Sequence, residues 1–212
     1  FYPLENHDGS RVQPGNRVDL APGGAETFMS YDLPWANASN APFRLFKHWV
    51  HEGGVSTPLI AHWPAGISND GDSFRSTAEG HLHDSPSHLI DIMVTALDIA
   101  KADYPAENEG SATKPVEGIS LDPAFSGKTL QRGNPIYFEH EGNRAVRDGQ
   151  WKLVAKGVNG AWELYNMEAD RTESTNLIQD NPALAEQMIA QSAAWATHAG
   201  VGPFNSWKKD QK

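Results

Sequence analysis

The sequence Phe46-Lys47-His48-Trp49-Val50-His51-Glu52-Gly53-Gly54 is followed by Thr57-Pro58-Leu59-Ile60-Ala61-His62-Trp63-Pro64. A lysine stands five residues before a Glu-Gly-Gly turn, and a β-prone run then leads to Trp-Pro. Because glycine adopts positive φ angles without steric cost, the paired glycines indicate a tight turn. We therefore predict a sharp turn at residues 52–54 and a buried strand over residues 55–63, with Pro58 at a sheet edge or strand start.

This arrangement resembles a segment of type I, formylglycine-dependent arylsulfatases, in which K-x-x-x-x-E-G-G precedes a strand ending in W-P. In that family the lysine binds the sulfate group of the substrate, so the resemblance assigns substrate binding and a catalytic role to Lys47. The chemistry agrees with this role, because fixed cations stabilise the charge that moves toward the bridging oxygen in the transition state. Lysine supplies a compact charge with three donors. Without the surrounding motif, a lone lysine indicates only a solvated surface residue.

The resemblance covers only the C-terminal portion of an arylsulfatase. The family's nucleophile lies in C/S-x-P-x-R, and the single partial match, Ser56-Thr57-Pro58, has Ile60 at its fifth position. The chain has no cysteine, and its only Asp-Asn pair, Asp180-Asn181, reads as a loop entering a helix. The resemblance implies that the intact enzyme uses formylglycine and calcium, both held by a missing N-terminal catalytic portion. We expect the chain alone to be inactive and, because it starts at Phe1 without a signal peptide, to be a piece of a longer protein.

Composition narrows the function classes. The chain has 212 residues, of which 39% are hydrophobic, enough for one good core or two small ones. Its formal net charge of −10 argues against a general nucleic-acid binder. No apolar run approaches the ~18–20 residues that a membrane span needs. The resemblance implies a sulfate ester or a sulfated glycan as the substrate, and it favours a periplasmic or secreted location.

Turn and helix signals define the rest of the chain. Residues 1–45 are rich in Gly and Pro and are predicted to be irregular. Ser85-Pro86 is predicted to begin a helix whose apolar stripe runs to about residue 104. Asp148-Gly149, a favoured type I′ turn, and Asn159-Gly160 separate strand candidates between residues 136 and 165. Asn181-Pro182 begins a last helix that ends near Gly200.

These elements predict an α/β fold. They match the C-terminal part of the alkaline-phosphatase-like sulfatase fold, with a small subdomain formed by a four-stranded antiparallel sheet and one helix. We assign residues 1–130 to the C-terminal part of the main sulfatase domain and residues 131–212 to this subdomain.

A second cluster is the run Glu139-His140-Glu141-Gly142-Asn143-Arg144. Runs of the form E-H-E-G-N-R-A-V-R recur in bacterial arylsulfatases before a W-K-L-V strand, which residues 151–154 provide here. At a strand end next to a turn, His140 is placed to reach a site. We assign His140 and His51 to substrate binding beside Lys47. The alternative for His140 is a hydrogen-bonded turn residue.

Histidines close in sequence also suggest a metal site. His48, His51 and His62 surround the Glu-Gly-Gly turn, and His81-Leu82-His83-Asp84 forms another group. His48 and His51 have no acidic partner at helical spacing, so we interpret these histidines as polar lining or hydrogen-bonded groups and predict no metal ligand in this chain.

Two other functions remain open. The first is a phosphonate or phosphate monoester hydrolase of the same superfamily, because the same cationic clamp suits either tetrahedral anion. The second is a non-catalytic fragment that binds a partner chain or a sulfated ligand, an interpretation based on the absent nucleophile.

Overall fold

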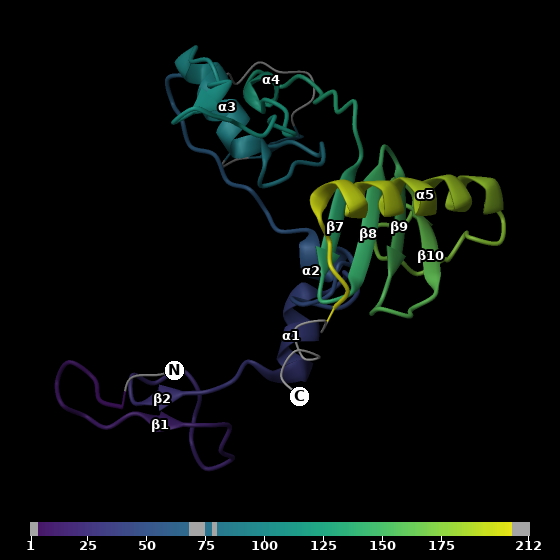
Figure 1. The fold of residues 1–212 in the computed structure, drawn as a ribbon. Helices are drawn as coiled ribbons and strands as arrows, with labels where there is room; N and C mark the ends of the chain where they lie inside the picture. Colours follow the sequence, from purple (N-terminus) through teal and green to yellow (C-terminus); the bar gives the residue numbers. More distant parts are fainter. Residues whose placement is uncertain (1–3, 68–74, 78–79, 205–212) are drawn as a thin grey trace. The chain divides into compact units, whose positions relative to one another are not determined.

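The computed structural model describes residues 4–67, 75–77 and 80–204 (Figure 1). The chain divides into two compact units, the first comprising residues 1–57, 137–146 and 150–212 and the second comprising residues 58–136 and 147–149. The first unit is built on β1 (Gln13–Pro14), β2 (Thr27–Phe28), α1 (Asp32–Asn40), α2 (Glu52–Val55), β7 (Ile136–His140), β8 (Asn143–Asp148), β9 (Trp151–Ala155), β10 (Trp162–Asn166) and α5 (Pro182–Ala199). The predicted division at residues 130/131 concerns an intact sulfatase and stays a prediction.

A four-stranded antiparallel sheet with strand order β10-β9-β8-β7 organises the first unit. In the β9–β10 pair, Trp162 lies opposite Ala155 and Asn166 lies opposite Trp151. The connection between β8 and β9 consists of Gly149 and Gln150, and of these only Gly149 has a positive φ, 52°. That pattern is typical of a type II′ turn, so the predicted type I′ turn is wrong. The predicted meander with one helix is confirmed.

One face of the sheet packs against α5, which crosses the strands in Figure 1. Residues from three strands meet two residues of the helix in a buried cluster, which consists of Val146, Leu153, Leu164, Ala185 and Met188. The helix begins at Pro182, and Gly200 follows it with a left-handed φ of 72°, as predicted. Because side chains point alternately to the two faces of a sheet, every second residue of these strands faces α5.

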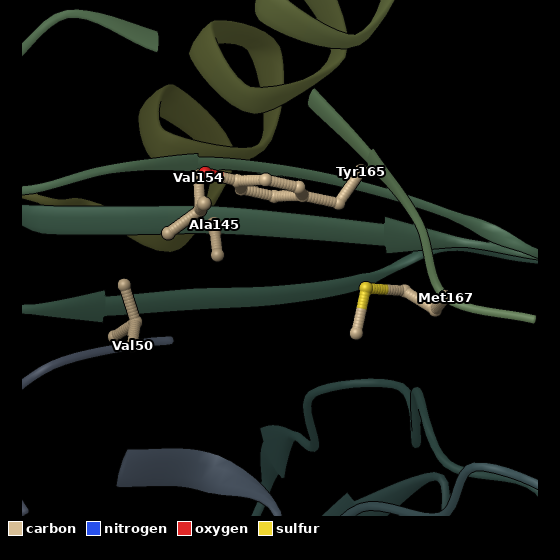
Figure 2. Packing of buried hydrophobic residues seen from close by; sticks show 5 residues of the cluster. All are labelled: Val50, Ala145, Val154, Tyr165 and Met167. Carbon is tan, nitrogen blue, oxygen red and sulfur yellow. The ribbon is translucent and has the colours of Figure 1, made fainter. Parts of the chain in front are cut away.

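The other face of the sheet carries a second buried cluster, which consists of Val50, Ala145, Val154, Tyr165 and Met167. Figure 2 shows Val50, Ala145 and Met167 on the side that is turned away from α5. Val50 belongs to residues 43–57, which we call the lysine segment. The sheet thus lies between α5 and the lysine segment, so the segment that carries Lys47 rests on a rigid support.

In the second unit, a buried aspartate connects separate segments by hydrogen bonds. Its elements are β3 (Arg75–Thr77), β4 (Gly80–Leu82), α3 (Asp91–Ala100), β5 (Glu107–Asn108), β6 (Ser111–Ala112) and α4 (Asp122–Phe125). The Asp91 carboxylate accepts hydrogen bonds from the backbone N–H groups of His88 (2.7 Å) and Ile119 (2.9 Å) and pairs with Arg132. The helix runs from Asp91 to Ala100, so the predicted start at Ser85-Pro86 and end near residue 104 are wrong. Ser85 Oγ accepts a hydrogen bond from Leu130 N and does not cap a helix.

The predicted buried strand over residues 55–63 is wrong. Residues 52–55 form α2, and residues 56–63 are not a strand. Leu59 and Ile60 are 55% and 89% exposed. A strand needs a neighbouring strand for its backbone hydrogen bonds, and within the described residues none pairs with this run. The apolar stripe of α3 is exposed at Ile92 and Met93, while the buried residues of α3 are Asp91 and Thr95.

Residues 1–45 are less irregular than predicted. They contain the short parallel pair β1–β2 and the helix α1, which buries none of its residues. Among the described residues, no helix is long and apolar enough to cross a membrane.

The α5 face of the sheet gives a direct test of stability. Leu153 is fully buried there, so Leu153→Ala is expected to lower the free energy of unfolding by about 2–5 kcal/mol through lost burial and a residual cavity. Leu89→Ala, at an exposed leucine, is expected to change it by less than about 0.5 kcal/mol. Urea denaturation followed by circular dichroism measures both. Equal effects would contradict the assigned core.

Candidate functional site

Lys47 lies in a turn that is closed by a hydrogen bond from Trp49 N to Phe46 O (3.1 Å). Its side chain is exposed and, within the described residues, makes no hydrogen bond or ion pair. The neighbours Leu45 and His48 have left-handed φ angles of 64° and 97°. Such angles are costly for residues other than glycine and persist only where the surroundings impose them. The turn therefore fixes the backbone at Lys47 and leaves its ammonium group accessible to solvent.

Gly53 and Gly54 are needed because backbone approaches them closely. A Cβ atom on Gly53 would lie 2.1 Å from Leu45 O, and one on Gly54 would lie 1.9 Å from Trp49 O. Gly53 N also donates to Arg44 O at 2.9 Å. Neither glycine has a positive φ, so the predicted reason for the pair is wrong. The glycines of the Glu-Gly-Gly sequence allow α2 to pack closely against the Lys47 turn.

A buried charge network fixes the lysine segment to the sheet. The Nζ atom of Lys152, on β9, lies 2.9 Å from Glu52 Oε1 and 2.9 Å from Glu173 Oε1. Lys152 and Glu173 have exposed side-chain fractions of 0%, and that of Glu52 is 10%. The second oxygen of Glu173 accepts a hydrogen bond from Glu52 N at 2.8 Å, at the start of α2. Glu52 therefore binds the sheet through both its side chain and its backbone.

A second polar network lies beside the first and contains His51. Glu163, on β10, accepts hydrogen bonds from Arg44 (2.9 Å) and from the Tyr165 hydroxyl (2.8 Å), and its Oε2 lies 3.3 Å from His51 Nε2. Burial and the neighbouring Glu163 raise the pKa of Tyr165. Although burial favours the neutral acid, hydrogen bonds from Tyr165 and Arg44 hold the pKa of Glu163 below its usual value. His51 is 1% exposed and belongs to this network, and its predicted contact with substrate stays a prediction.

His140 meets the Lys47 turn on the first unit's surface. The rings of His48 and His140 lie 5.5 Å apart, and His48 Nδ1 lies 2.9 Å from Glu141 Oε2. Buried Asn143 donates to His48 O (3.3 Å) and to His140 O (2.9 Å), and it accepts from Gly157 N. The structure thus brings His140 to the residue next to Lys47, through a contact between distant parts of the sequence.

The remaining histidine groups do not form a site of this kind. His62 is exposed, and His83 Nε2 lies 2.9 Å from Lys128 O. The residues that could hold an ion, searched over the described chain, are His48, His140 and Glu141. Calcium takes six to eight oxygen ligands. A set with two imidazoles does not fit calcium. The calcium of the intact enzyme, whose ligands were predicted to lie outside this chain, stays a prediction.

Residues 43–193 match the family model of the N-sulphoglucosamine sulphohydrolase C-terminal domain. The chain belongs to this sulfatase family. Its matched region begins at the start of the lysine segment and ends within α5. The match thus covers the lysine segment, the buried charge networks, the four-stranded sheet and the second unit.

Individual sulfatases agree with this assignment. An uncharacterized sulfatase of Schizosaccharomyces pombe is 28% identical over 94% of this chain and 34% of its own length. A sulfatase of Formosa agariphila is 30% identical over 81% of this chain and 32% of its own length. The solved structure of Ps i-CgsB in complex with k-i-k-neocarrahexaose is 25% identical and has a TM-score of 0.58 over 74% of this chain and 32% of that one. The chain spans about a third of the length of the curated relatives.

Because Lys152 is buried between two carboxylates in this sulfatase domain, we expect Lys152→Met to destabilise the fold strongly. The change keeps most of the volume but removes the cation between Glu52 and Glu173, while Arg171, at 3.4 Å from Glu52 Oε2, still pairs with Glu52. Loss of the buried cation is expected to cost about 3–5 kcal/mol of unfolding free energy. Lys101→Met, at an exposed lysine in an i,i+3 pair, is expected to cost less than about 1 kcal/mol. Chemical denaturation of both variants checks the contrast, and a Lys152→Met protein as stable as Lys101→Met would rule out the anchoring role.

We expect the buried His51 to make the stability of the fold depend on pH. Burial lowers the pKa of His51 below that of an unfolded histidine. The neutral ring thus contributes stability that is present above about pH 6.5 and is lost as the pH falls through the folded-state pKa, with a slope of up to ~1.4 kcal/mol per pH unit. His51→Gln should flatten this slope between pH 7.5 and 5. Urea unfolding at several pH values tests it, and an unchanged slope would show that His51 does not contribute.

Proposed function

We propose that this chain is the C-terminal portion of an arylsulfatase-like sulfuric ester hydrolase of the alkaline-phosphatase superfamily. It contributes Lys47, a wall of the substrate site and the C-terminal subdomain. The nucleophile, as formylglycine, and the carboxylate ligands of a calcium ion come from the N-terminal catalytic portion, so the chain is inactive alone. Family membership supports the reaction class. The observation that carries the role of this chain is that Lys47, on an anchored turn, is exposed and has no partner among the residues that the structure describes.

Lys47 acts by electrostatic stabilisation. A fixed ammonium group beside the ester holds the non-bridging oxygens and offsets the charge that develops on the leaving oxygen. Anchoring is important here, because a donor that is already in position does not reorganise during the reaction. The Glu52–Lys152–Glu173 network and the close packing at Gly53 and Gly54 provide that positioning. His140 contacts the substrate at the rim and contributes less.

The substrate is a sulfated glycan rather than a simple aryl sulfate. Relatives that cover 68% of this chain at 26–27% identity are N-acetylgalactosamine-6-sulfatases of dog, mouse, pig and rat, named for a sulfated amino sugar. The charged side chains around Lys47 are consistent with a polar ligand. A phosphate or phosphonate monoester is the competing substrate class, because Lys47 binds either tetrahedral anion.

A full-length protein that carries this chain as its C-terminal portion provides the kinetic test. Lys47→Ala is expected to lower kcat for a sulfate ester by about 10²–10³-fold, because one fixed donor to a developing oxyanion is lost. Lys47→Arg should restore it only in part, since the planar guanidinium places its donors differently. His140→Ala should have a smaller effect.

Matched substrates and an exposed lysine complete the design. Lys101→Ala serves as the control variant, and a sulfate and a phosphate ester of the same alcohol are compared. Near-native turnover by a folded Lys47→Ala protein would refute the assignment of Lys47. Faster turnover of the phosphate ester would favour the competing substrate class.

A further inference from the structure

The cluster of His48, His140 and Glu141 has no role in the proposed reaction beyond a rim contact of His140, yet its donors converge. Each residue offers one ligand atom, and these atoms all lie within 4.8 Å of one another. His48 comes from the Lys47 turn, whereas His140 is the last residue of β7 and Glu141 lies in the turn between β7 and β8. We infer that this cluster is a binding site for a divalent transition-metal ion, with Zn²⁺ as the representative ion.

The donor set selects the class of ion. Two imidazole nitrogens and one carboxylate oxygen suit Zn²⁺ and its neighbours, whereas Ca²⁺ and Mg²⁺ prefer oxygen ligands alone. Tetrahedral zinc with bonds of about 2.0–2.2 Å keeps its ligand atoms about 3.4 Å apart. His48 Nδ1 and Glu141 Oε2 lie 2.9 Å apart, and all three ligand atoms lie within 4.8 Å of one another, so zinc binding requires this pair to open and any wider pair to close. Three protein ligands leave a fourth position open for water or an anionic oxygen.

The backbone that carries the cluster is already held in place before an ion binds. His48 and Glu141 both have left-handed φ angles, 97° and 52°, in which non-glycine residues are uncommon. Asn143, 1% exposed, donates to the carbonyl oxygens of both histidines and so joins the two turns. Gly142 N donates to Glu139 Oε1 at 2.8 Å, which fixes the turn that carries Glu141. Little conformational entropy is therefore lost when an ion binds.

Access and composition favour the same conclusion. The side chains of His48 and Glu141 are 41% and 46% exposed, so an ion reaches the site from solvent. The chain has no cysteine, so no thiolate competes for zinc, and any tight site must use histidine and carboxylate. Ion binding at this cluster does not depend on sulfate ester hydrolysis.

Calorimetric titration of the full 212-residue chain with ZnCl₂ tests the site. We expect one equivalent of Zn²⁺ to bind and to raise the thermal unfolding midpoint, because the ion joins two turns of the folded state. His140→Gln, Glu141→Gln and His48→Asn should each weaken binding by at least about 10-fold. Asparagine is chosen at position 48 because it tolerates a left-handed φ.

Matched controls separate this cluster from other surface groups. His62→Gln changes an exposed histidine, and Glu109→Gln changes an exposed glutamate that also has a left-handed φ, 50°. Both should bind Zn²⁺ as the unchanged chain does. Circular dichroism without metal checks folding, and isosteric Glu141→Gln carries the test if another variant is unfolded. Absence of binding by the unchanged chain, or equal affinity of a folded Glu141→Gln protein, would overturn the inference.

Discussion

The Lys152 ammonium group, fully buried between Glu52 and Glu173, is the contact on which the position of the lysine segment depends. Burying one cation and two carboxylates is costly unless each is paired. The alternative to pairing is an uncompensated charge inside the first unit, so the lysine segment is held firmly on the sheet. Glu52 lies five residues after Lys47, and the glycines that follow it allow the Lys47 turn to pack directly on α2. The buried Lys152 thus anchors the backbone of the segment that carries the exposed Lys47.

The sequence predicts the sheet and α5 well because their signals are local. Turn residues near 149 and 160, alternating apolar residues and the Asn181-Pro182 start depend on short-range geometry. The networks could not be predicted in this way. Lys152 and Glu173 lie far from Glu52 in the chain, and a lysine inside a strand reads as a solvent-facing residue until the partner segment is placed over it. The cluster of His48 with Glu141 was missed for the same reason, because its acidic partner comes from another turn.

One physical cause explains why two apolar runs are exposed. Residues 55–63 and the stripe of α3 have the composition of buried elements, but Ile60 and Met93 are exposed. An apolar pattern indicates that burial of a segment is favourable, but it does not identify the residues that bury it. Because the chain spans about a third of its curated relatives, these surfaces are consistent with the proposal that another portion of an intact sulfatase contributes to the fold. The two polar networks of the first unit, in contrast, are formed by residues of that unit.

Hydrogen exchange at the amides of Gly53 and Gly54 measures the anchoring of the Lys47 turn most directly. Gly53 N donates to Arg44 O and Gly54 N donates to His51 O, so both amides exchange only when the lysine segment opens. If the buried Lys152 network holds the segment on the sheet, their opening free energies will equal those of amides in β9 and β10, and all will fall together in Lys152→Met. Fast exchange at Gly53 and Gly54 beside protected strands would contradict the account.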